Sequence, residues 1–230
     1  MSVRQKVPED LTARKALALE VIDRLKKEYP DAGCTLDYAH AWQLLVSVRL
    51  AAQCTDARVN IVVEDLFAKY PSVAALAAAE PEDIEAIVKP CGLGHSKARD
   101  ISACMRMLRD KYDCQVPATF EELLALPGVG RKSANLIMGD VFGKPAIVTD
   151  THCIRLCNKI GLVDGIKEPQ KVEMALWKII PPEEGSDLCH RFVMHGRAVC
   201  NARKPECEHC CLKAICRYAQ EQFGAQTAGS

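Results

Sequence analysis

Two stretches of this sequence hold residues whose types and spacing could do chemistry. The first, at residues 126–135, reads Leu-Pro-Gly-Val-Gly-Arg-Lys-Ser-Ala-Asn. Gly128 and Gly130 free the backbone to turn tightly, and a helical pattern of apolar residues follows at once. Backbone N–H groups at the start of a helix, together with the helix dipole, favour a phosphate. With Arg131 and Lys132 directly after the turn, the stretch predicts binding to the DNA backbone; a plain helix–helix corner is the simpler alternative.

The second stretch is rich in cysteine. Cys200, Cys207, Cys210 and Cys216 follow the spacing C-x6-C-x2-C-x5-C. Zinc sites usually pair two close Cys-x2-Cys knuckles, whereas this stretch has one close pair. Four thiolates at these spacings suit an iron–sulfur cluster better, with a zinc ion as the alternative. Cys211 adjoins the third cysteine, so the spacing alone leaves the choice open; we expect Cys210 to bind and Cys211 to be a packed free thiol.

Basic residues are concentrated around these cysteines. The whole chain has 30 basic and 30 acidic residues, which argues against a generally cationic coat for nucleic acid. Between residues 191 and 217, however, six Lys and Arg residues stand against two Glu, a net charge of +4. Arg203 and Lys204 lie between the first two cysteines of the motif. A loop closed by metal would hold them outward as phosphate contacts, and a solvated charge pair explains them equally well.

The elements that must position these residues are helices. Aromatic residues make up only 5% of the chain, and strict apolar–polar alternation is scarce, so the fold class is all-α. No apolar run approaches the length of a membrane span, and the 13 cysteines are expected to be reduced, with some of them binding metal. The expected helices cover residues 8–29, 40–53, 56–70, 72–79, 81–88, 96–112, 119–125, 134–141, 150–160, 168–180, 186–197 and 212–220.

Five segments together resemble the endonuclease III family of DNA glycosylase/AP lyases. They are residues 50–60, 91–98, 126–135, 149–162 and 195–216. The similarity runs from about Leu17 to Arg217. It implies two helical domains: a six-helix domain with the helix-hairpin-helix motif at 34–144, and an iron–sulfur cluster domain made of 1–33 with 145–230. The second domain is expected to hold one 4Fe-4S cluster.

The resemblance also implies an activity: excision of oxidised pyrimidines in base excision repair, followed by strand cleavage by β-elimination. Lys132 matches the family's Schiff-base lysine, and Asp150 its catalytic aspartate. A lysine must be neutral to attack C1′ of the sugar, yet its reference pKa is about 10.4 and useful values are roughly 7–8. The helix dipole contributes only about 0.3–1 kcal/mol towards a gap of roughly 3–5 kcal/mol. Arg131, burial or the carboxylate of Asp150 must supply the rest.

Each of these two residues also has a simpler interpretation. Lys132 could be a surface lysine that grips a phosphate, and only its pairing with Asp150 favours catalysis. Asp150 stands directly before a helical pattern, as an ordinary N-cap does. The two interpretations of Asp150 are compatible, because a capping aspartate stays ionised near neutral pH and could accept a proton.

A base inside a duplex must be extruded before it can react, and the gap must be filled. The family inserts a glutamine and a leucine, which correspond here to Gln53 and Leu93. Gln53 could equally be an incidental polar residue at a helix end. Leu93 could be a staple onto the helix expected near Ser96. Lys97, further along, could contact DNA or simply lie in a solvated helix start.

Two rival functions remain open from the sequence. A mismatch adenine glycosylase shares the fold and cluster pattern but lacks the hairpin lysine. A non-catalytic helix-hairpin-helix module would bind DNA without using Lys132 and Asp150. The expected partner is double-stranded DNA with a damaged base or an abasic site, with no membrane association. We expect a monomer located in the cytoplasm, with the nucleoid if the source is prokaryotic.

Overall fold

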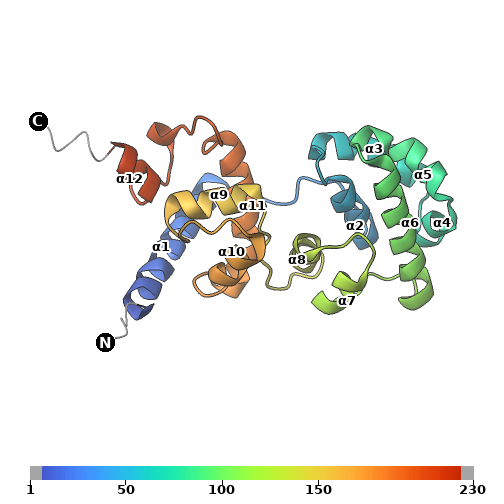
Figure 1. Ribbon diagram of the computed structural model, residues 1–230, viewed down its shortest axis with the longest axis horizontal. Helices are drawn as coiled ribbons and strands as arrows, with labels where there is room; N and C mark the ends of the chain where they lie inside the picture. The colour runs from blue at the N-terminus through green and yellow to red at the C-terminus, as the bar shows by residue number, and fades with distance from the viewer. Residues whose placement is uncertain (1–6, 224–230) are drawn as a thin grey trace, which may run out of the picture. The chain divides into compact units, whose positions relative to one another are not determined.

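The computed structural model describes residues 7–223, and every regular element in that range is a helix. The all-α prediction is therefore confirmed. The chain divides into two compact units, each with its own helices (Figure 1). One unit joins the segment that ends at Gly33 to the segment that begins at Pro145; the other runs from Cys34 to Lys144. Within the described range, no helix has the length and apolar character needed to cross a membrane.

The unit from Cys34 to Lys144 is organised around one long helix, α6 (Gly94–Lys111), which packs against α4 (Val73–Ala78) and α5 (Pro81–Val88). The apolar face that the sequence predicts for α6 is buried, with Ile101, Met105 and Leu108 at most 2% exposed. Two helices of this unit, α4 and α7, are only six residues long. The other elements are α2 (Ala41–Leu50), α3 (Asp56–Lys69), the 3-10 turn η1 (Lys89–Cys91), α7 (Phe120–Ala125) and α8 (Arg131–Asp140).

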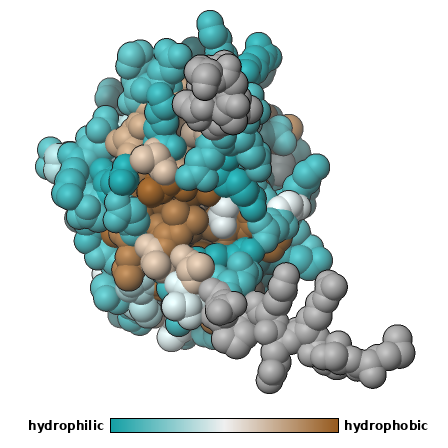
Figure 2. Space-filling view, turned by 90° about the vertical axis from the view of Figure 1, so that its left-hand side faces the viewer, coloured by the Kyte–Doolittle hydropathy of each residue, from teal (hydrophilic) through white to brown (hydrophobic). Residues whose placement is uncertain are grey.

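The other unit brings the two ends of the chain together. Its helices are α1 (Val7–Glu28), α9 (Thr151–Ile160), α10 (Pro169–Leu176), α11 (Gly185–Ala198) and α12 (Arg217–Phe223), with 3-10 turns η2 (Pro182–Glu184) and η3 (Cys207–His209). α11 packs against α1 and α9, and α9 also contacts α12. On the face of the molecule drawn in Figure 2, apolar side chains gather in a hollow that hydrophilic side chains surround.

Three expected helices are clearly shorter than their patterns predict. α10, expected over residues 168–180, covers only Pro169–Leu176. α2 ends at Leu50 instead of residue 53, because Cys54 N–H turns back to the carbonyl of Ala51 at 3.1 Å and Gln53 adopts a left-handed backbone. α12 begins at Arg217 instead of residue 212. The residues before it form turns, in which Cys216 N–H donates to the carbonyl of Leu212 at 2.9 Å.

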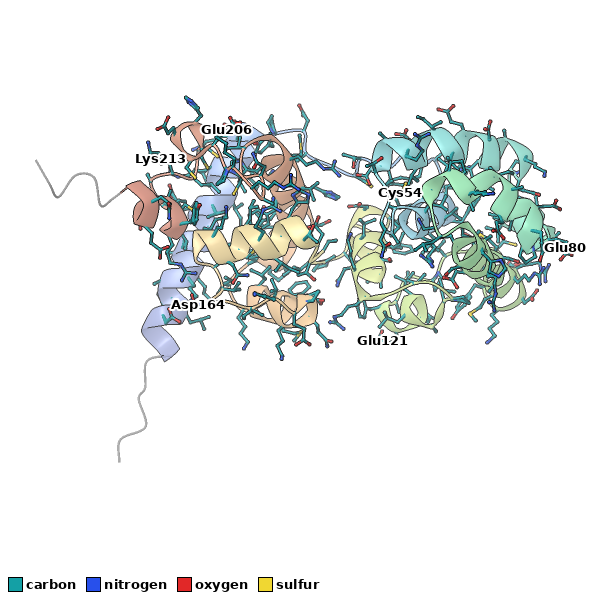
Figure 3. The ribbon with its side chains drawn as sticks, turned by 45° about the horizontal axis from the view of Figure 1, so that its top comes forward. Cys54, Glu80, Glu121, Asp164, Glu206 and Lys213 are labelled. Atoms are coloured by element: carbon teal, nitrogen blue, oxygen red, sulfur yellow. The ribbon has the colours of Figure 1, made fainter. Side chains whose placement is uncertain are left out.

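One aspartate ties α1 to α12. Asp164 accepts hydrogen bonds from Arg14 of α1 and from Arg217, the first residue of α12. Arg217 also donates to the carbonyls of Asn158 and Val163, at 2.9 and 3.3 Å. Figure 3 labels Asp164 beside α1. The bonds from Arg217 and then Arg14 hold the pKa of Asp164 below its usual value.

The substitution Asp164→Asn should therefore lower the thermal unfolding midpoint. The carboxylate is 54% exposed, so solvent screening limits the loss to roughly 0.5–1 kcal/mol, or about 1–4 °C. Because the folded-state pKa is depressed, the stabilisation is present above the unfolded pKa near 3.9 and is lost as the pH falls through the folded value. The difference between wild type and variant should close below about pH 4.

Asp110→Asn is the matched control for this experiment. Asp110 pairs with the adjacent Arg109 on the surface of α6 and so joins no two elements. Differential scanning calorimetry of both variants across pH checks the prediction. If Asp110→Asn lowers the unfolding midpoint as much as Asp164→Asn does, the proposed link between α1 and α12 through Asp164 would be contradicted.

Candidate functional site

Residues 126–130 form the predicted hairpin between α7 and α8. Thr119 caps α7, and its hydroxyl accepts the N–H of Glu122 at 3.3 Å, as the capping pattern predicts. Gly128 has φ +75°, a left-handed conformation that side chains rarely adopt. Val129 N–H donates to the carbonyl of Leu126 at 3.2 Å and closes the turn.

The hairpin rests on an ion pair that the sequence did not point to. Arg49 of α2 donates to the carboxylate of Asp100 of α6 at 2.7 Å. A Cβ added at Gly128 would lie 2.8 Å from Cβ of Asp100 and 3.1 Å from Cδ of Arg49. Two constraints therefore require glycine at position 128: the left-handed backbone, and the closeness of the Arg49–Asp100 ion pair.

The two predicted cations open α8. Gly130 is the N-cap, with extended backbone and no side chain to cap the first N–H groups of the helix. The guanidinium of Arg131 lies 4.9 Å from the ring centre of Phe120, a cation–π contact that holds it over the end of α7. Lys132 is exposed in the first helical turn. Buried residues further along α8, Ile137 among them, anchor this turn to the core.

Asp150 occupies the N-cap position of α9. Its carboxylate accepts the N–H of Cys153 at 2.7 Å, so the N-cap interpretation is confirmed. The link before it, residues 146–149, is buried against the start of α11. Gly185 makes this packing possible, because a Cβ there would lie 2.4 Å from the carbonyl oxygen of Ala146. Asp150 is thus fixed by its own backbone and by the buried link.

Lys132 and Asp150 belong to different units of the chain. Lys132 is held by the hairpin and α8, and Asp150 by the buried link and α9. The pairing of the amine with the carboxylate stays a prediction.

Gln53 and Leu93 share an unusual backbone conformation. Their φ angles are 58° and 51°, which for residues with a Cβ costs roughly 1–2 kcal/mol each. Gln53 is exposed in the turn after α2, and Leu93 is 58% exposed in the turn before α6. The exposure of Leu93 argues against a staple onto α6, because a stapled side chain would be largely covered. Both side chains are carried outward on strained turns.

Both sequence interpretations of Lys97, a DNA contact or a solvated helix start, are wrong. Its side chain is fully buried, and its ammonium donates to the carbonyls of Leu50 and Cys91, each at 2.8 Å. A signal for this burial existed in the sequence. Lys97 lies four residues before Ile101 and eight before Met105, on the predicted inward face of the helix.

The four cysteines of the motif line one shared cavity. Apolar residues of α9 and of the loop complete its wall, among them Leu156, Ile160 and Leu212. Burial raises the pKa of three of the thiols, Cys200, Cys207 and Cys216. Across residues 7–223, no three His, Cys, Asp or Glu side chains meet closely enough to hold a single metal ion. The thiols surround the cavity and do not converge on a point.

One buried and one half-buried side chain outside the motif hold the cysteine loop. His195 lies between the thiol of Cys210, 3.2 Å from its Nε2, and the hydroxyl of Tyr29, 3.0 Å from its Nδ1. Arg155 of α9 donates to the carbonyls of Gly196 and Cys200, at 3.1 and 2.9 Å. The helix that begins at Asp150 therefore also anchors the first cysteine.

Arg203 and Lys204 are exposed on the same loop. The side chain of Asn201 accepts the N–H of Lys204 at 2.7 Å, and Glu206 N–H donates to the carbonyl of Val199 at 3.0 Å. These bonds close the loop behind the two cations. Figure 3 labels Glu206 on this loop, with Lys213 further along.

Comparison with known proteins places the chain in a family. Residues 46–182 match the HhH-GPD superfamily of base excision DNA repair proteins. Endonuclease III of Synechocystis sp. is 43% identical, over 91% of this chain and 96% of the relative. Endonuclease III of Escherichia coli K12 is 37% identical, over 90% and 98%. The chain belongs to the endonuclease III family.

Solved structures of the endonuclease III family agree with this assignment. A trapped endonuclease III–DNA covalent intermediate superposes with a TM-score of 0.85 at 40% identity, over 91% of this chain and 98% of the other. A non-covalent endonuclease III–DNA complex superposes with a TM-score of 0.86 at the same identity and coverage. A thermostable thymine-DNA glycosylase, at 21% identity and a TM-score of 0.78, shares the fold.

In this member of the endonuclease III family, Gly128→Ala should destabilise the hairpin unit by about 2–3 kcal/mol. The left-handed backbone and the displacement of Arg49 and Asp100 both contribute. Gly130→Ala is the matched control, because its backbone is extended and nothing lies within 4 Å of an added Cβ. We expect that variant to stay within about 0.5 kcal/mol of wild type. Urea unfolding measures both, and equal losses would contradict the packing argument.

Proposed function

We propose that this chain excises oxidised pyrimidines from double-stranded DNA and then cleaves the strand through an imine formed on Lys132. Membership of the endonuclease III family makes it a base excision DNA glycosylase with AP lyase activity. The observation that carries the residue assignment is the position of Lys132, exposed in the first turn of α8 directly after the hairpin. An amine at that position would face a sugar whose phosphate the hairpin binds.

In the proposed reaction, the neutral amine of Lys132 attacks C1′ of the damaged nucleotide. The bond from C1′ to the base breaks, and the base leaves with a proton. The sugar ring opens to give an imine between Lys132 and C1′. Removal of a C2′ proton then expels the 3′ phosphate by β-elimination, and water releases the enzyme. Asp150 takes the proton from the lysine and stabilises positive charge on the sugar, while its other oxygen can remain on the helix cap.

The remaining predicted residues bind and open the duplex. Backbone N–H groups at Gly128 and Gly130, with Arg131, hold a phosphate at the start of α8. Arg203 and Lys204 add phosphate contacts from the cysteine loop. Insertion of Gln53 and Leu93 fills the space that the extruded base leaves. Their exposure on strained turns supports this assignment, because strain of that kind accumulates at functional sites.

We infer that Cys200, Cys207, Cys210 and Cys216 hold one 4Fe-4S cluster in the unit that joins residues 1–33 to 145–230. The four thiols line a common cavity with apolar walls, as a cluster wider than one ion requires. When bound, the cluster supplies a rigid, redox-active centre. By holding the cluster, the four cysteines would fix the loop that carries Arg203 and Lys204. Action on DNA predicts a cytoplasmic location, associated with the nucleoid if the source is prokaryotic.

Reduction with borohydride should trap a covalent complex between the wild-type protein and DNA containing thymine glycol or an abasic site. Lys132→Ala should abolish trapping, since no amine remains to form the imine. Asp150→Asn should lower turnover by about 10²–10⁴-fold, while DNA binding survives because asparagine still caps α9.

Lys111→Ala, an exposed lysine at the end of α6, is the control and should trap as wild type does. Equal trapping by Lys132→Ala would refute the nucleophile. Unchanged turnover in Asp150→Asn would remove that residue from the mechanism.

Replacing any one of the four motif cysteines by serine should reduce bound iron and the broad visible absorption of the cluster. Cys211→Ser is the matched control and should retain both, because its neighbour Cys210 is the ligand. Reconstitution with iron and sulfide should be more complete at about pH 8.5 than at about pH 7, since burial raises the pKa of the thiols that must lose protons. Loss of iron in Cys211→Ser would revise the ligand set.

A further inference from the structure

The turns that carry Gln53 and Leu93 are joined by one buried side chain. Lys97, in the first turns of α6, donates from its ammonium to the carbonyl of Leu50, the last residue of α2, at 2.8 Å. The same nitrogen donates to the carbonyl of Cys91 at 2.8 Å. The first acceptor lies three residues before Gln53, and the second lies two residues before Leu93. Lys97 therefore bridges the beginnings of both turns.

The backbone of Lys97 holds the second turn as well. Its N–H donates to the carbonyl of Leu93 at 3.0 Å, which starts α6. The thiol of Cys54, labelled in Figure 3, interacts with that of Cys91 beside the ammonium and, second to burial, helps raise the pKa of the Cys91 thiol. The chain thus connects the residue after Gln53 to a residue just before Leu93. The two turns form one bonded assembly.

The chemistry of Lys97 indicates a role beyond capping the end of α2. Lys97 is among the largest fully buried side chains of the described residues, and burial lowers its pKa because a charged ammonium loses its water. A neutral amide or hydroxyl could cap α2 without that penalty. A lysine combines two properties that are needed to hold two carbonyls from separate segments at one nitrogen: a stem longer than that of an amide side chain, and more donors than the single O–H of a hydroxyl.

Both turns need a contact that fixes their positions. Each presents an exposed side chain from a left-handed backbone that the local sequence does not favour. Insertion into a duplex requires that both side chains be in place when the base leaves the stack, and misplacement by about 1 Å can cost about 100-fold in rate. Without a fixed spacing, each turn would relax independently.

We propose that Lys97 is a positioning residue that sets the spacing between Gln53 and Leu93, so that the two side chains enter the duplex together. The inference rests on the insertion roles assigned to these residues under the proposed function. It assigns Lys97 to base extrusion and not to the covalent steps, which Lys132 performs.

The test compares Lys97→Met with Lys111→Met, an exposed lysine at the far end of the same helix. With a duplex containing thymine glycol, Lys97→Met should slow excision by about 10–100-fold, whereas Lys111→Met should not. Trapping on single-stranded abasic DNA needs no extrusion and should change by less than about 3-fold. A 2-aminopurine placed opposite an abasic-site analogue should show a smaller fluorescence rise with Lys97→Met, because unstacking is impaired.

Combining Lys97→Met with substitutions of the inserted residues distinguishes a positioning role of Lys97 from a general contribution to stability. In a Gln53→Ala/Leu93→Ala background, Lys97→Met should add less than about 2-fold to the loss, because nothing remains to be positioned. Equal losses on duplex and single-stranded substrates, or a fully additive loss in the triple variant, would overturn the proposal. If Lys97→Met does not fold, Lys97→Gln keeps a donor group on a shorter side chain and should give an intermediate loss confined to the duplex.

Failure of the proposed function gives a different result from failure of this inference. A wild-type protein that traps no abasic DNA would refute the lyase activity itself. A Gln53→Ala/Leu93→Ala variant as active as wild type would refute the insertion roles. Impaired excision in that double variant, together with wild-type excision by Lys97→Met, would overturn the assignment of Lys97 alone.

Discussion

The direct contact between the hairpin and the Arg49–Asp100 ion pair decides where α8 begins. A Cβ at position 128 would lie 2.8 Å from Cβ of Asp100, and the backbone there has φ +75°, so only glycine fits the turn without strain. The extended N-cap at Gly130 and the first turn of α8 follow directly. The placement of Lys132 therefore depends on packing beneath the hairpin, several residues away from the amine itself.

In the unit formed by the two ends of the chain, α9 has a comparable role. Its N-cap is Asp150, and from its middle Arg155 holds the carbonyl of Cys200. Its last turns line the cavity that the four motif cysteines share. One helix therefore orients the proposed catalytic carboxylate and also anchors the loop with Arg203 and Lys204. Changes in the cysteine loop are thus mechanically linked to the residue assigned to proton transfer.

Buried polar side chains hold the irregular segments in both units. Lys97 joins the turns of Gln53 and Leu93 through two carbonyls, and His195 joins Cys210 to Tyr29 of α1. Irregular backbone cannot satisfy its own carbonyls and thiols as a helix does, so side chains from neighbouring helices must do so. In both cases a fully or nearly fully buried polar group supports a segment with a proposed role in DNA repair.

The sequence by itself determined the features that depend on neighbours along the chain. The cap at Thr119, the hairpin glycines, the N-cap at Asp150 and the apolar face of α6 follow from contacts a few residues apart, and motif spacing identified the family. Only the tertiary structure decided that Lys97 is buried, that Leu93 is exposed and that Arg49 with Asp100 lies under Gly128. Those outcomes depend on which surfaces of separate helices meet, and no local pattern contains that information.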